Sequence, residues 1–178
     1  RGRRLEEKAD LVAIDLRSGA ERFGLADAFL PLIDAMEQAI DELEESVFFL
    51  TSMPTSGADD GSEARLAALC RAAVGGAEAA ARMADAASCV HEGHRRDVDD
   101  ALAALADLVG AEHQADEEER ASIAAVLSAA EASAARVFAV VECARRVEGA
   151  TDHFAHAGHL MRALVIEGLD TRGGRSPI

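Results

Sequence analysis

Aromatic residues are scarce in this 178-residue chain, which contains no tryptophan, no tyrosine and only six phenylalanines. Sheet proteins of this size usually place aromatic and β-branched residues on their strands, so this scarcity argues against a sandwich or a barrel. Proline is also rare, with three residues, and alanine is the most frequent of the apolar residues that make up 49% of the chain. Because alanine favours helix and proline breaks it, the composition predicts an all-α protein.

Basic residues are few as well. Lysine and arginine number 18 against 33 aspartates and glutamates, which gives a formal net charge of −15, and Lys8 is the single lysine. Nucleic acids require a basic surface that neutralises phosphates, so we expect no direct binding to DNA or RNA. An anionic membrane surface would also repel the chain as a whole. Cations are the small partners that this charge favours.

Cysteine is limited to Cys70, Cys89 and Cys143, an odd number without the spacing Cys-x-x-Cys. We expect all three to be reduced thiols in the core of a cytoplasmic protein. No apolar run approaches the roughly 20 residues that span a bilayer as a helix. The sequence also contains no recognisable pairing of a nucleophile with a base and no glycine-rich phosphate loop, so we predict that the chain is not an enzyme.

Five segments carry apolar residues at helical spacing, and they cover residues 3–17, 26–50, 62–90, 95–128 and 130–168. This period predicts a bundle of long antiparallel helices. In the first segment we expect the stripe of Leu5, Ala9, Val12 and Leu16 to face the core. Turn-forming residues predict a loop over residues 51–62, weaker breaks at 18–20 and 91–94, and a flexible tail from about residue 170.

The spacing Glu-x-x-x-Asp occurs once in each of four predicted helices, as Glu6/Asp10, Glu37/Asp41, Glu112/Asp116 and Glu148/Asp152. Residues four apart lie on one helix face, and each pair directly follows residues of an apolar stripe. The carboxylates should therefore border the contact between helices. The first two pairs lie 31 residues apart and the last two 36 apart, which indicates an internal repeat.

Two such helices side by side would gather four carboxylates, whose repulsion must be relieved by protonation, by arginine or lysine, or by a metal ion. Lys8 and Arg120 are the nearest bases at helical spacing. Oxygen ligands suit hard cations, so the pattern favours metal binding, with a solvated acidic face as the alternative. We interpret the neighbouring Asp34 and Glu119 as solvated side chains.

The ordered set of acidic pairs resembles the PhoU-like superfamily, and most closely its Pit-accessory branch of phosphate-transport regulators. Residues 5–10 and 111–116 are similar to the segment Leu-Glu-x-x-Ala-Asp on the second helix of each bundle in that family. Residues 36–41 and 147–157 are similar to the Glu-x-x-x-Asp segment on the third helix. The resemblance spans about residues 3–168 and implies two tandem three-helix bundles.

The resemblance also implies two metal clusters, the first formed by Glu6, Asp10, Glu37 and Asp41 and the second by Glu112, Asp116, Glu148 and Asp152. The bound ion would be iron, zinc, manganese, magnesium or calcium. The implied function is that of a cytoplasmic accessory protein, peripheral to the inner face of the membrane, that regulates a membrane phosphate transporter. Residues 1–55 would form the first helical repeat and residues 56–178 the second.

The resemblance implies a further long helix before Leu5, which this sequence does not contain, so we expect the first bundle to be incomplete. The face left uncovered on residues 3–50 would favour a homo-oligomer. Two other functions are open. A di-metal carboxylate enzyme of the helical-bundle type would need Glu-x-x-His pairs, and no glutamate here has histidine three residues later. In the third, a helical interaction scaffold, the acidic pairs would bind no ligand.

Overall fold

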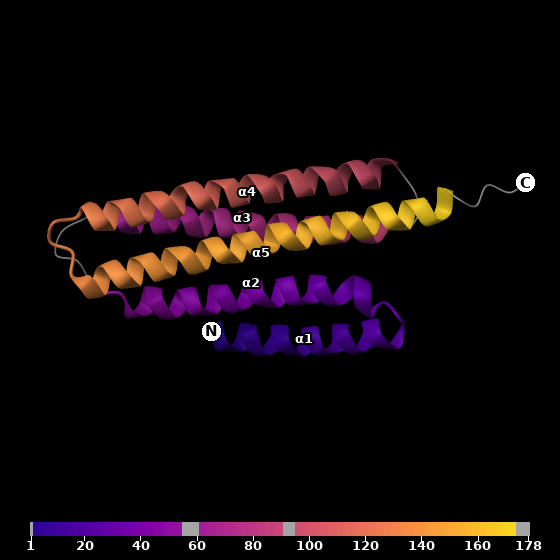
Figure 1. Cartoon of the computed structure of the whole chain (residues 1–178), viewed down its shortest axis with the longest axis horizontal. Coiled ribbons are helices and arrows are strands. Elements are labelled where there is room, and N and C mark those ends of the chain that lie inside the picture. The colour runs from indigo at the N-terminus through magenta and orange to yellow at the C-terminus, as the bar shows by residue number, and fades with distance from the viewer. Residues whose placement is uncertain (1, 55–60, 91–94, 174–178) are drawn as a thin grey trace, which may run out of the picture.

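The computed structural model describes residues 2–54, 61–90 and 95–173, and within them the chain forms five helices and no strand. The helices run antiparallel along one long axis (Figure 1). They are α1 (Gly2–Arg22), α2 (Ala26–Ser52), α3 (Ser62–Cys89), α4 (Arg95–Ser128) and α5 (Ala134–Gly173). The predicted all-α class is confirmed. None of these helices is long and apolar enough to cross a bilayer over the residues described.

The turn between α1 and α2 depends on Gly24, whose φ of +68° is one that other residues rarely adopt. The Leu25 N–H donates to the Ala20 carbonyl at 2.8 Å, which is the closing bond of a glycine-terminated helix. The predicted break at residues 18–20 is therefore wrong, because α1 continues until a residue with positive φ is available. The predicted break at 91–94 lies outside the described residues.

The start of α5 is set by Ser133, whose hydroxyl accepts a hydrogen bond from the Arg136 backbone N–H at 3.2 Å. Serine is a favoured residue just before a helix because its oxygen satisfies one of the N–H groups that lack a partner within the helix. Periodicity predicted this helix from residue 130, four residues too early, because Ala129, Ala130 and Ala132 continue the alanine-rich pattern without being helical.

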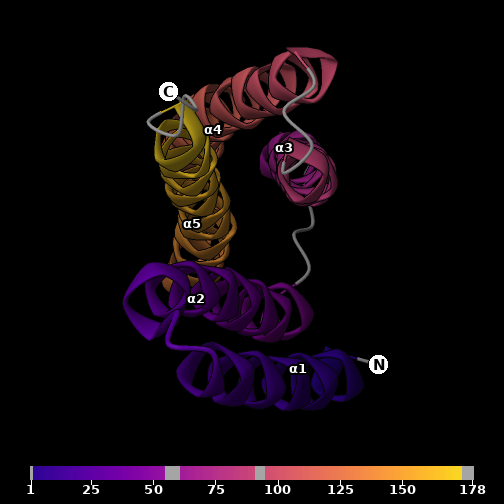
Figure 2. The ribbon, with the colours of Figure 1, turned by 90° about the vertical axis from the view of Figure 1, so that its right-hand side faces the viewer.

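The helices α3, α4 and α5 pack against one another, α2 packs on α5, and α1 packs mainly on α2. Viewed end-on, α2 therefore lies between α1 and the other three helices (Figure 2). Ala39 of α2 joins Met83, Leu108 and Phe154 in one buried cluster, so α2 shares the core of the larger group. The predicted division between residues 1–55 and 56–178 stays a prediction.

Gly158 of α5 is buried against the leucines of α4. A Cβ atom at this position would lie 2.6 Å from the Leu108 Cδ1 and 3.1 Å from the Leu105 Cδ1. At the buried Gly76 of α3, by contrast, a Cβ atom would lie 3.6 Å from the Ala111 Cβ, which is an ordinary van der Waals contact. Interiors are packed as densely as organic crystals, so only glycine fits at residue 158 without movement of its neighbours.

The helix α1 buries a different face from the one that its apolar stripe predicted. Val12 and Leu16 are 58% and 54% exposed, whereas Ala13 and Ala20 are buried. The expectation that Val12 and Leu16 face the core is therefore wrong. The physical reason is that α1 has one main neighbour, so only a narrow strip is covered, and small alanines allow α2 to approach there.

Candidate metal centre

The first predicted cluster lies between α1 and α2, the two helices that carry its four residues. The pKa of Asp41 is raised by partial desolvation and by the nearby charges of Asp10, Glu37, Glu42 and Glu44. The structure thus brings Asp10, Glu37 and Asp41 close enough for their charges to interact. Two further glutamates of α2, which sequence reasoning did not include, contribute to the same electrostatic field.

Arg17 pairs with one of the four predicted residues of this cluster, Glu37. Its guanidinium donates to both carboxylate oxygens of Glu37, at 2.5 Å to Oε1, and to Asp34 Oδ1 at 2.6 Å. These bonds raise the pKa of Arg17 still further above its usual range. Helical spacing pointed to Lys8 on the same helix and missed Arg17, because the contact is made across the turn to α2. Asp34, which we expected to be solvated, is thus part of an ion pair.

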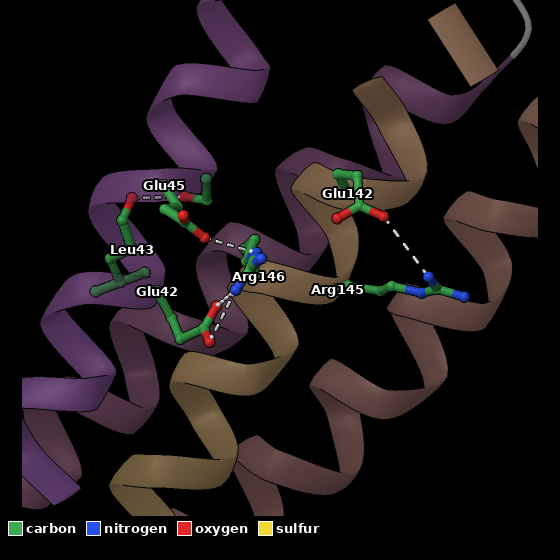
Figure 3. A network of polar contacts seen from close by, with 7 residues as sticks. Glu42, Leu43, Glu45, Glu142, Arg145 and Arg146 are labelled. Atoms are coloured by element: carbon green, nitrogen blue, oxygen red, sulfur yellow. Dashed lines mark hydrogen bonds and ion pairs between the residues drawn. The ribbon is translucent and has the colours of Figure 1, made fainter. Parts of the chain in front are cut away.

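A second arginine reaches the acidic face of α2 from α5. Arg146 pairs with Glu42 at 3.1 Å and with Glu45 at 2.9 Å, whereas its neighbour Arg145 pairs with Glu142 on its own helix (Figure 3). Arg146, Glu42 and Glu45 border a polar cleft of about 440 Å³, whose other lining residues are Glu6, Asp41 and Glu44. Glu6 and Asp41 of the predicted set therefore face one cleft, together with an arginine.

The second predicted cluster lies between α4 and α5 and is centred on Glu148. Burial raises the pKa of the half-buried Glu148 to about 7, and the charges of Asp152, Glu119, Asp116 and Glu112 raise it further, in that order. All four predicted residues are therefore brought together. Glu119, which we expected to be solvated, is half-buried and belongs to the same group.

Few bases compensate the second cluster. Asp116 pairs with Arg120 at 2.7 Å, as the helical spacing predicted, and His113 lies 3.4 Å from Glu112. Both partners are side chains of α4 itself and both are largely exposed. Within the described residues, no arginine or lysine pairs with Glu148 or Asp152. The pKa of Glu148 is accordingly shifted further than that of Asp41 in the α1–α2 cluster.

The donor chemistry of the α4–α5 cluster fits a hard cation, since it offers several carboxylate oxygens and an excess of negative charge. The positions of the side chains fit less well. The described part of the chain contains no group of three or more His, Cys, Asp or Glu residues arranged to hold a metal ion. A cation here would therefore require side chains to move inward from their present positions.

Comparison with known proteins assigns no relative to this chain. No family model, curated protein or solved structure matches it. The function must therefore be argued from the carboxylate clusters and from the order of the acidic pairs along the chain.

Proposed function

We propose that this chain is a metal-binding regulator of phosphate transport, built as PhoU-like tandem helical bundles. It would act as a cytoplasmic accessory protein beside a membrane phosphate transporter. The order of the four Glu-x-x-x-Asp pairs along four long helices supports this proposal. No catalytic step is part of it, because the carboxylates would hold a cation without activating a substrate.

The observation that carries the proposal is the environment of Glu148. Burial and then the charges of four other carboxylates raise its pKa, and it has no basic partner in the described part of the chain. A cluster of this kind loses stability through like-charge repulsion unless a proton or a cation neutralises it. We expect Mg²⁺, Ca²⁺, Mn²⁺, iron or zinc to bind at the α4–α5 cluster, held by Glu112, Asp116, Glu148 and Asp152.

A ligand-free scaffold is the second candidate, and the α1–α2 cluster favours it locally. Arg17 already neutralises Glu37, and Arg146 borders the cleft that Glu6 and Asp41 line. A cation at Glu6, Asp10, Glu37 and Asp41 would have to compete with these guanidinium groups. We therefore expect this cluster to bind metal more weakly than the α4–α5 cluster.

The test is elemental analysis by mass spectrometry on protein purified without a metal-affinity tag or a chelator. The variant Asp116→Asn plus Asp152→Asn removes two carboxylates from the α4–α5 cluster. The control Asp85→Asn plus Glu117→Gln removes the same charge from exposed positions of α3 and α4. We expect at least one equivalent of metal in the wild type and the control, and a loss in the cluster variant.

Thermal unfolding gives an independent readout, because an ion that binds only the folded state raises the melting temperature. Added metal should stabilise the wild type and the control but not the cluster variant. Equal metal content in all three proteins would contradict the proposed ligands. A protein that takes up none of the five ions after incubation would leave the scaffold as the better interpretation.

A further inference from the structure

A second cleft, of about 480 Å³, lies at the end of the bundle where α2 ends and α3 and α5 begin. Its walls are mainly apolar and include Leu50, Met53 and Leu66, with Cys70 beside them. Its polar lining residues are Arg136 and Glu63. This size and this combination of apolar walls with few charged groups are typical of small-molecule sites, which measure about 300–1,000 Å³.

Arg136 is the unusual residue of this cleft, because it is a cation with an exposed fraction of only 3%. Its guanidinium donates to the Pro54 carbonyl at 3.0 Å, to Ser62 Oγ at 3.2 Å and to Glu63 Oε1 at 3.3 Å. Among these described acceptors, the Pro54 carbonyl and Ser62 Oγ are neutral and Glu63 is anionic. A buried guanidinium must remain paired with a negative charge or lose considerable stability, so the anionic position matters.

Glu63 fills that anionic position from the solvent side. Its side chain is 71% exposed, whereas that of Arg136 is 4% exposed. The Glu63 carboxylate can therefore turn into water at small cost, provided that another carboxylate takes its place on Arg136. Exposed members of ion pairs contribute little to stability, so an incoming carboxylate that also buries an apolar chain would displace Glu63.

We propose that this cleft binds an apolar monocarboxylate, whose carboxylate replaces Glu63 on Arg136 while its chain lies against Leu50, Met53 and Leu66. Planar guanidinium groups match carboxylates in geometry and charge. The net charge of −15 repels small hydrophilic anions, so burial of the apolar chain must supply most of the affinity. A fatty acid and the C-terminal residue of an apolar peptide both offer this chemistry.

Cys70 reports on occupancy of the cleft, since it lines the cavity and none of the three cysteines forms a disulfide. Cys89, which we expected in the core, is exposed, so the full chain with Cys89→Ser keeps only the half-buried Cys70 and the buried Cys143 as thiols. We expect decanoate at five times its dissociation constant to slow alkylation of Cys70 by N-ethylmaleimide about sixfold. At the same concentration, acetate lacks the chain and decanol lacks the charge, so neither should slow it comparably.

Glu63→Gln replaces this competing carboxylate with an amide whose oxygen can still accept from Arg136. In protein that circular dichroism shows to be folded, it should lower the decanoate concentration needed for half-maximal protection several-fold. Glu118→Gln is the matched control, because the Glu118 carboxylate pairs with Arg65 at the same distance of 3.3 Å on the surface. An apolar peptide with a free or an amidated C-terminus distinguishes the two sources. Stronger protection by the free peptide than by decanoate assigns the cleft to peptides, and the reverse assigns it to fatty acids.

Three results would overturn the proposal. The first is alkylation of Cys70 that no carboxylate slows. The second is equal protection by decanol and decanoate, which would exclude a role for Arg136. The third is an identical response of Glu63→Gln and Glu118→Gln, which would mean that the Arg136–Glu63 pair only ties α3 to α5.

Discussion

Two helix pairs in this molecule carry the same acidic pattern but compensate its charge differently. Between α1 and α2, Arg17 from across the turn and Arg146 from α5 reach the carboxylates of α2. Between α4 and α5, the bases near the cluster are side chains of α4, and the pKa of Glu148 is raised to about 7. The pattern places the carboxylates, but residues elsewhere in the chain decide which of them an arginine reaches.

The two pairs also differ in how their helices are held together. The α4–α5 contact is apolar and close, with Gly158 against Leu105 and Leu108. The α1–α2 contact buries small residues such as Ala13 and is completed by the ion pairs of Arg17. Burial of apolar area stabilises a contact regardless of charge, so the α4–α5 pair can tolerate repulsion among its carboxylates. The α1–α2 contact lacks this apolar stabilisation and depends on the ion pairs of Arg17.

Gly158→Ala should have the largest effect on this comparison, because it acts on the apolar contact of α4 with α5. The new Cβ would lie 2.6 Å from the Leu108 Cδ1, so the core must shift. Overpacking of this kind costs about 1–3 kcal/mol, and the higher helix propensity of alanine offsets about 1 kcal/mol of this cost. We expect a net loss of up to about 2 kcal/mol in the free energy of unfolding, measured by urea denaturation.

Gly76→Ala is the matched control, since it places the same methyl group in ordinary contact at 3.6 Å from Ala111. This variant should be neutral or more stable than the wild type, because alanine is the better helix former. Equal destabilisation by the two substitutions would mean that the α4–α5 contact is no tighter than the rest of the core.

Arg17→Met should release α1 while leaving the other four helices folded. The substitution keeps an apolar side chain of similar length but leaves Glu37 and Asp34 without their cation. We expect several-fold faster hydrogen exchange in the backbone of α1 and little change in α4 and α5, because local stability varies along a structure. Arg82→Met, which breaks the exposed pair with Asp107, is the control and should change neither. Uniformly faster exchange in all five helices would contradict a separable α1.

The five helices could be predicted from periodicity because long amphipathic segments carry a strong and local pattern. The residues at which the helices begin and end were harder to predict. The turn at Gly24 depends on a backbone angle, and the start of α5 depends on a single hydroxyl of Ser133. The contact face of α1 was misassigned, because a stripe that includes Leu16 predicts burial only if a neighbour covers it.

The acidic residues of the candidate site could be predicted from the sequence, whereas its bases could not. Glu112 and Asp116 lie on one face of a helix by spacing alone, and so does Arg120. Arg17 and Arg146 reach α2 from other helices, and spacing within one helix contains no information about such contacts. The excess of charge around Glu148 is likewise a property of the assembled bundle.

Glu148→Gln tests the charge difference between the two clusters directly. The folded pKa of about 7 lies above the ordinary value of 4.5, so the folded chain binds the proton more tightly than the unfolded chain. This contribution to stability is therefore present below about pH 4.5 and is lost as the pH rises towards about 7. In the presence of a chelator, Glu148→Gln should match the wild type at pH 4 and exceed it at pH 8.5. We expect the free energy of unfolding to rise by about 1 kcal/mol. This is less than the full pKa shift would give, because water screens a half-buried carboxyl group.

Asp41→Asn at the α1–α2 cluster should raise the free energy of unfolding by a smaller amount, since Asp41 is more exposed and Arg17 already pairs with its neighbour Glu37. Equal gains from the two variants would mean that Arg17 and Arg146 do not set the clusters apart, and that both acidic faces are solvated alike.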